Sequence, residues 1–394
     1  MTYKETGDKV NSLYETNKEL FNKYILECKD KIEKLHFNNK ELQEGFAIYQ
    51  DLLNKGLITG DIKVGDVIKD HRLNMTKVKE NHTYRVVNDT ETICNKIEVN
   101  NDFTEVAKLA SLFHDIARCP QAITSNTFHD KECKLFKGLS HAEYGYKMLY
   151  IDKMLNDYQV PKEYHYALAL SVLNHQKNNS SDIHFNNVKE LDVNFLKGQE
   201  QLSKQEFIII STLTQLVRDV DKIDILYQHI TGEFPVVRPF IKYEINGKTL
   251  DEICSKYNID KEILKNYNNL ENDNLENRKY INIPSDYVDL NKLVVPSDIK
   301  DSFFQNKDLD LKKLQNREDY SFIVGMWWRL NHFLNDINFV ANLEILKENN
   351  TLEKIYNEFP LRYKFLVTEA FDFAKEEILD KKLEENRGKV FVKK

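Results

Sequence analysis

The stretch Leu109-Ala-Ser-Leu-Phe-His-Asp-Ile-Ala-Arg118 decides the fold of this chain. Four apolar residues in and just before it recur at i, i+4, i+7 and i+11: Val106, Ala110, Phe113 and Ala117. That spacing is typical of the buried face of a helix. His114 lies within the same stripe, and Asp115 follows it directly. Because ionisable side chains on a buried face are costly unless they are paired or bind a metal ion, the stretch predicts a helical core with a polar site inside it.

Composition favours a protein that is built mainly from helices. The 394 residues include only 12 glycines and 7 prolines, whereas many-stranded sandwiches, barrels and propellers need a turn every ten residues or so. Charged residues make up 30% of the chain and hydrophobic residues 41%, which suits a globular protein with a large core. The length allows two or three domains of ordinary size. We therefore expect a mainly α fold with more than one domain.

The charge balance excludes some classes of partner. Lys and Arg number 56 and Asp and Glu number 63, which gives a net charge of −7. Without a broad basic surface the chain is not expected to bind duplex nucleic acid, although a local pocket for one phosphate ester is compatible with this balance. No stretch approaches 18 uninterrupted apolar residues, so no membrane contact is expected. The five scattered cysteines form no C-x-x-C pair and the N-terminus has no apolar run, so we expect reduced thiols in a cytoplasmic protein.

Inward ionisable residues recur on other segments with a helical pattern. Each of these segments carries a single His or Asp in line with its apolar stripe: His82, His141, His175 and Asp221. Wide separation along the chain suits one ligand per helix and does not suit the local loops of zinc fingers. Imidazole and carboxylate without thiolate favour Mn, Fe, Co, Ni, Zn or Mg. With His114 and Asp115 there are six candidate ligands, which is enough for two metal ions bridged by Asp115; a hydrogen-bonded polar cluster without metal is the alternative.

At these residues the sequence resembles the HD-domain metal-dependent phosphohydrolases, and a bacterial group among them. His82, His114-Asp115 and Asp221 match the H…HD…D signature of that superfamily, and the two further histidines resemble its binuclear members. The order of short motifs also fits: HDIAR-x-x-Q, Phe128-His-Asp130, His141-Ala-x-x-Gly145, Asn174-His175 and Arg218-Asp-x-Asp-Lys-Ile-Asp224. The resemblance covers roughly residues 75–230 and the C-terminal helices. It implies a helical bundle that holds divalent metal ions.

Two residues depart from the usual pattern of the superfamily. Ala117 stands where glycine is usual after the HD pair, and Cys119 stands where an aromatic residue is common. Neither change removes a candidate ligand. We therefore expect an altered pocket around an intact metal site.

The resemblance implies hydrolysis of a small phosphomonoester or phosphodiester, such as a nucleotide, by a metal-activated water. The residues expected to take part in catalysis are Asp115, Arg118 and Lys222. Arg118 and Lys222 either contact a substrate phosphate or form surface salt bridges. Asp219 and Asp224 are expected either to support the ligands or to lie on the helix surface. His129-Asp130 is a second HD dipeptide in a polar stretch, and we interpret it as part of a loop or lid.

Two alternative functions stay open from the sequence. The same ligand set resembles the di-iron HD-domain oxygenases, which cleave C–C or C–P bonds. A binding or scaffold protein is the third hypothesis, in which the module at residues 240–284 recruits a glycan or a partner and the helical core is a ligand-controlled scaffold.

Residues 240–284, FIKYEINGKTLDEICSKYNIDKEILKNYNNLENDNLENRKYINIP, show a β-α-α-β pattern. This segment resembles a LysM module, a small fold that binds N-acetylglucosamine polymers in other proteins. The resemblance implies a glycan partner, and a protein-interaction or purely structural role is equally compatible with it. Prolines concentrate around the segment, which indicates an insertion. The expected division is an N-terminal accessory helical region (1–73), the HD core (74–238), the LysM-like insertion (239–286) and C-terminal helices that complete the HD domain (287–394).

Overall fold

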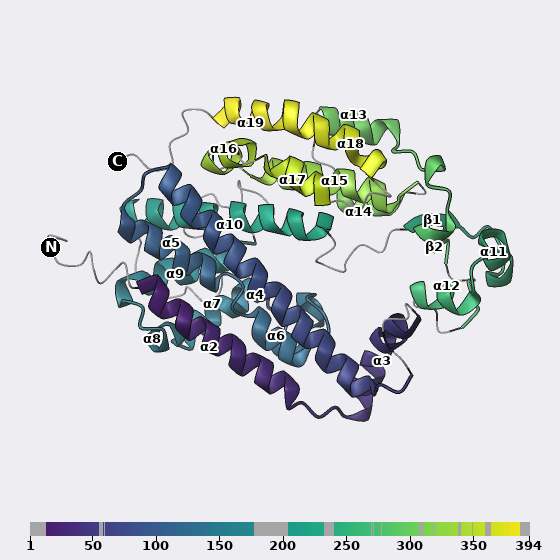
Figure 1. Cartoon of the computed structure of the whole chain (residues 1–394), viewed down its shortest axis with the longest axis horizontal. Helices are drawn as coiled ribbons and strands as arrows, with labels where there is room; N and C mark the ends of the chain where they lie inside the picture. Colours follow the sequence, from purple (N-terminus) through teal and green to yellow (C-terminus); the bar gives the residue numbers. More distant parts are fainter. Residues whose placement is uncertain are drawn as a thin grey trace.

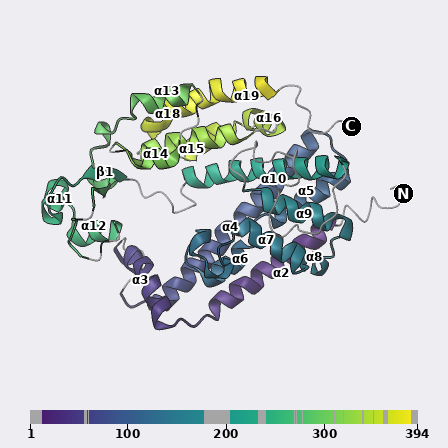
Figure 2. The ribbon, with the colours of Figure 1, turned by 180° about the vertical axis from the view of Figure 1, so that it is seen from behind.

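The computed structural model is mainly α-helical, as the composition predicts. It describes the following residues: 13–54, 58, 60–176, 204–231, 240–268, 270, 272–276, 278–305, 307, 310–317, 319–337, 340–348, 350–358 and 364–386. The described helices and strands form three groups, each with its own hydrophobic cluster. Figures 1 and 2 show these groups from opposite sides, with the long helix α10 between two of them.

The largest group contains the helices of the N-terminal half. Their bounds are α2 (Leu13–Glu33), α3 (Asn39–Asn54), α4 (Val64–Lys96), α5 (Asn101–Phe113), α6 (Arg118–Thr124), α7 (His141–Tyr146), α8 (Met154–Asp157), α9 (Lys162–Asn174) and α10 (Lys204–Thr231). Helix α5 lies at the centre and packs against α4, α9, α10 and α2. Its nine residues from Glu105 to Phe113 are all buried, which explains why this helix is apolar around most of its surface. The side chain of Asn100 caps its first turn by accepting a hydrogen bond from the backbone N–H of Phe103.

A second group of helices packs on the other side of α10. It contains α13 (Ser297–Phe304), α14 (Leu311–Gln315), α15 (Phe322–Asp336), α16 (Val340–Glu348), α17 (Thr351–Glu358), α18 (Lys364–Phe373) and α19 (Leu379–Asn386). Its core surrounds Trp327, which is fully buried and donates a hydrogen bond to the backbone carbonyl of Leu366. Helix α10 belongs to both groups, because Val217 lies in the first hydrophobic cluster and Leu226 in the second. One helix therefore joins the two halves of the molecule.

Residues 240–284 form the third group, a small β-α-α-β unit beside α3 (Figure 1). Its elements are β1 (Phe240–Glu244), α11 (Leu250–Tyr257), α12 (Lys261–Tyr267) and β2 (Tyr280–Pro284), with the two strands antiparallel and Lys242 opposite Asn282. Thr249 and Glu252 form a capping box that starts α11. The predicted order of elements is thus confirmed, whereas the assignment to the LysM family stays a prediction.

The first predicted domain boundary does not coincide with a break in the structure. Helix α4 runs without interruption from Val64 to Lys96, so the expected boundary after residue 73 lies inside it. Phe21, Ile25 and Cys28 of α2 belong to the same hydrophobic cluster as α5, so α2 is part of that core and not an appendage to it. No helix in the described part of the chain combines the length and the apolar character that crossing a membrane requires.

Candidate metal centre

The six candidate ligands meet inside the first group of helices as two sets of three. The first set is His82 from α4, His114 from the end of α5 and Asp221 from α10, and its ligand atoms all lie within 4.8 Å of one another. The second set is Asp115, His141 and His175, with the same mutual spacing. All six residues are buried. The structure therefore brings together every residue that the sequence suggested as a ligand, and their binding of metal stays a prediction.

His114 and Asp115 are neighbours in sequence but belong to different sets, and both lie in a tight turn after α5. The predicted helix through Ala117 is interrupted, because α5 ends at Phe113. In the turn that follows, the N–H of Ile116 donates to the carbonyl of Phe113, and the N–H of Arg118 donates to the carbonyl of Asp115. Each of these bonds spans three residues, whereas an α-helical bond spans four. The physical reason is Pro120, because proline has no N–H and its ring collides with the carbonyl four residues earlier in a continuous helix. Proline is tolerated in a first turn, so α6 begins anew at Arg118.

The carboxylate of Asp115 lies between the two sets. Its Oδ2 is 3.5 Å from Nε2 of His82 and 3.7 Å from Nε2 of His114, which belong to the first set. Its Oδ1 is 3.2 Å from Nε2 of His141 and 3.9 Å from Nε2 of His175, which belong to the second. One oxygen thus faces each set, which is the arrangement that a bridging carboxylate needs.

Hydrogen bonds at Nδ1 of three histidines leave Nε2 free to bind. Nδ1 of His82 lies 2.6 Å from Oδ2 of Asp224. Nδ1 of His114 and of His175 each lie 2.6 Å from a backbone carbonyl three residues earlier. Since carbonyls and ionised carboxylates only accept, each Nδ1 carries a proton, and a neutral ring then presents an unprotonated Nε2.

The fourth histidine has the same arrangement. Nδ1 of His141 lies 2.9 Å from Oδ2 of Asp130, whose second oxygen binds Arg118 at 2.8 Å. Burial raises the pKa of Asp130, but the contacts with His141 and Arg118 outweigh it and hold that pKa at about 2. Asp130 is therefore an acceptor, and Nδ1 of His141 carries the proton. The side-chain amide of Gln176 lies 2.7 Å from the same Nδ1, so its oxygen, which can accept, must face that nitrogen.

The donor set fits a divalent cation. Nε2 of His82 and Nε2 of His114 face each other at 3.0 Å, and two lone pairs at that distance repel unless a positive charge lies between them. Without metal, that positive charge is a proton on His82. Burial and the charge of Lys79 lower the pKa of His82, but its hydrogen bonds to Asp221 and Asp224 outweigh them and raise that pKa overall. A divalent cation held by His82 and His114 would take the place of this proton.

The remaining ligands have the charge states that a cation prefers. Burial raises the pKa of Asp115 and of Asp221, but neighbouring cations and histidine hydrogen bonds outweigh it and hold both values well below the usual range. Burial and the neighbouring His114 lower the pKa of His175 to about 3, so that ring is neutral. Ionised carboxylate and neutral imidazole are the forms that bind metal ions.

Two supporting residues were missed or misjudged from the sequence. Lys79, which was not singled out, donates to Oδ2 of Asp115 at 2.7 Å; its position three residues before His82 on one helical face was the available signal. Asp130, interpreted as part of a loop or lid, accepts from both the backbone N–H and Nδ1 of His141. The alternative of a surface position for Asp219 and Asp224 is wrong, because both side chains are buried.

The two predicted catalytic cations differ in what the structure shows of them. Arg118 is not a surface residue: its guanidinium contacts Asp130, Gln121 and Nε2 of His141. Lys222 is buried on α10 beside Asp221, so the surface salt bridge expected as its alternative is excluded. Of the histidines without a predicted role, His184 and the side chain of His229 lie outside the described residues.

Comparison with known proteins agrees with this geometry. Residues 80–226 match the family model described as the HD domain, and this range includes all six candidate ligands. No curated protein and no solved structure matches the chain. The helical segment that brings the two sets of candidate ligands together is therefore similar to the HD domain.

Proposed function

We propose that this protein is a metal-dependent phosphohydrolase that acts on a small, nucleotide-like phosphomonoester or phosphodiester. The observation that supports this most is the position of Asp115, with one oxygen toward each of two three-residue ligand sets. Two divalent ions of the group Mn, Fe, Co, Ni, Zn or Mg fit such a donor set. Bound there, they would lower the pKa of a water molecule and neutralise charge on the phosphoryl oxygens. We also propose a cytoplasmic location, from the reduced thiols.

The residues around the ligands would hold this site in a working geometry. Asp224 and Asp130 orient His82 and His141, so each imidazole keeps its Nε2 directed at its own set. Arg118 holds Asp130 and places a positive charge beside Asp115, where developing negative charge on a phosphoryl group would be stabilised. Lys222 stays a proposed contributor to catalysis.

The test combines metal analysis with phosphate release. The purified protein is expected to contain bound transition metal, and a screen of nucleotides and other phosphoesters should identify an ester that releases phosphate. His114→Ala or Asp115→Ala should abolish both metal binding and hydrolysis while far-UV circular dichroism stays unchanged. His165→Ala is the matched control, because that imidazole bonds the carbonyl of Val160 and belongs to neither ligand set. Full activity of metal-free protein would exclude the proposal.

The same experiment separates hydrolysis from the di-iron oxygenase alternative. Both activities use the histidine and aspartate set that the structure brings together. Activation by manganese, with phosphate release under anaerobic conditions, is expected for the hydrolase. Iron dependence with oxygen consumption would favour the oxygenase instead.

A second candidate function belongs to the β-α-α-β unit. A surface groove lies between the turn that follows β1 and the segment that precedes β2, and its lining includes Asn246, Lys248, Asp273 and Arg278. Polar and charged groups of this kind suit a glycan of the N-acetylglucosamine type or a protein segment. Binding of chitin oligomers by the full chain, lost on Asn246→Ala, would support glycan recognition. No binding of these oligomers would leave the protein partner as the hypothesis to pursue.

A further inference from the structure

Two cations reach the carboxylate of Asp115 from different helices. Nζ of Lys79 on α4 lies 2.7 Å from Oδ2, and Nε of Arg118 on α6 lies 3.5 Å from Oδ1. Both cations also lie over one aromatic ring, that of Phe128, at 5.5 Å and 5.4 Å from its centroid. Phe128 packs against the small hydrophobic cluster of Ile32, Met75 and Ala122, and its ring lies beside both charges.

These cations lie on the more accessible side of the centre. The side chains of the six ligand residues are 0% to 6% exposed, whereas those of Lys79 and Arg118 are each 11% exposed. Nε of Arg118 is buried and, apart from the 3.5 Å ion pair with Asp115, makes no hydrogen bond with the described residues. A buried donor without an acceptor is costly, so an acceptor is expected at this point when the site is in use.

The ammonium group of Lys79 contacts the same oxygen that faces the first ligand set. Oδ2 of Asp115 lies 2.7 Å from Nζ of Lys79 and 3.5 Å from Nε2 of His82. A divalent ion in the first set would share this oxygen with the ammonium, and the two positive charges would repel each other. An additional anion that contacts both would relieve this repulsion. Phosphoryl oxygens are such an anion, and lysine binds them as a compact point charge.

We propose that Lys79, with Nε of Arg118, binds the anionic phosphoryl group of the substrate. This proposal rests on the proposed function and deepens it. In the absence of substrate, Lys79 serves as counter-ion of Asp115; with substrate present, its ammonium group contacts a phosphoryl oxygen. Lys79 is thus a residue that binds substrate, and it does not hold the metal ions.

The test measures binding of inorganic phosphate to the full-length protein loaded with manganese, by calorimetry. Lys79→Met should weaken phosphate binding by about 10- to 100-fold, because a charge-assisted contact is lost. Its affinity for manganese should not fall, because a competing cation has been removed. Lys79→Arg should retain phosphate binding to within roughly threefold, since it keeps the charge. Lys77→Met, at an exposed position of the same helix, is the matched control and should bind phosphate like the wild type.

Several results would overturn the proposal. Unchanged phosphate binding in Lys79→Met would do so, and so would a loss of manganese affinity as large as the loss of phosphate affinity, since that is the behaviour of a purely structural lysine. If Lys79→Met does not fold, Lys79→Gln must show the same selective loss. A wild-type protein that binds manganese and phosphate but hydrolyses no ester would refute the proposed function alone. A wild-type protein that hydrolyses esters with Lys79→Met unimpaired in phosphate binding would refute the binding site alone.

Discussion

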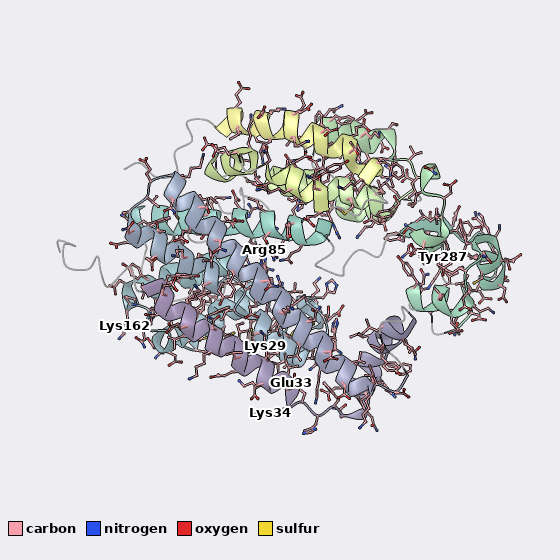
Figure 3. The ribbon with its side chains drawn as sticks, viewed as in Figure 1. Lys29, Glu33, Lys34, Arg85, Lys162 and Tyr287 are labelled. Carbon is pink, nitrogen blue, oxygen red and sulfur yellow. The ribbon has the colours of Figure 1, made fainter. Side chains whose placement is uncertain are left out.

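Asp224→Asn tests how much a residue contributes when it orients a candidate metal ligand without being a ligand itself. Oδ2 of Asp224 accepts from Nδ1 of His82 at 2.6 Å and from Gln228 at 2.6 Å. Arg85, labelled in Figure 3, donates to both oxygens of the same carboxylate. Each of these three hydrogen-bond partners is a donor. An asparagine has one acceptor oxygen and one NH₂ group, so either orientation of its amide places a donor against a donor.

The size of the effect follows from these contacts. Burial raises the pKa of Asp224, but the hydrogen bonds from His82 and Arg85 outweigh it and lower that pKa, so the residue is ionised and its bonds are charge-assisted. Such a bond contributes about 1.5–3 kcal/mol. Loss of a group that orients a ligating histidine costs roughly 10- to 100-fold in metal affinity, which corresponds to about 1.4–2.8 kcal/mol. The two estimates agree, so we expect an affinity loss in that range for the first ligand set.

The assay is a competition for manganese or zinc between the protein and a chromophoric chelator. Asp224→Asn should release one of the two metal ions at a chelator concentration that leaves the wild type loaded, while the second ligand set keeps its ion. Asp70→Asn, at an exposed position on α4, is the control and should match the wild type. Metal affinity within twofold of the wild type, in a folded Asp224→Asn protein, would refute the reasoning.

Three further predictions follow from burial and packing. Burial holds the pKa of His175 at about 3, so between pH 6.5 and about 3 the unfolded metal-free chain takes up a proton that the folded protein does not. Stability of the metal-free protein should therefore fall as pH decreases through this window, at about 1.4 kcal/mol per pH unit, and urea unfolding of His175→Gln should lack this contribution. The Cβ of Gly145→Ala would lie 3.1 Å from a side-chain carbon of α9, whereas that of Gly60→Ala meets nothing within 4 Å. Only the first variant should lose about 1–3 kcal/mol in urea unfolding and weaken the second ligand set, and equal behaviour of both would contradict this. Lys382, which is buried, donates to three backbone carbonyls at the end of α15, so Lys382→Met should destabilise the protein by roughly 2–3 kcal/mol in the same assay, and a loss below 0.5 kcal/mol would show that water replaces it.

The helical class and the inward position of the candidate ligands were predictable because both depend on local periodicity. A histidine that faces the core can be recognised by its position in an apolar stripe, as His114 and His175 can. This requires no knowledge of the helix that packs against it. The β-α-α-β order of residues 240–284 was predictable for the same reason, since β-branched runs and helix-period segments alternate there. These features need only the chemistry of neighbours along the chain.

The end of α5 shows where periodicity misleads. The apolar stripe from Val106 to Ala117 predicts one continuous helix, but the helix stops at Phe113. Pro120 carried the signal, because its ring forbids a helix that continues from Ile116. His114 and Asp115, which follow this break directly, lie in different candidate ligand sets.

The sequence by itself determined the helical class of the protein and which of its residues face the core. Only the tertiary structure decided how those residues divide into two sets, with Asp115 between them. It also decided which groups orient them: Asp224 meets His82 across 142 residues of chain, and Lys79 meets Asp115 across 36. The physical reason is that periodicity reports the face on which a side chain lies, whereas a hydrogen bond between helices depends on how those helices pack.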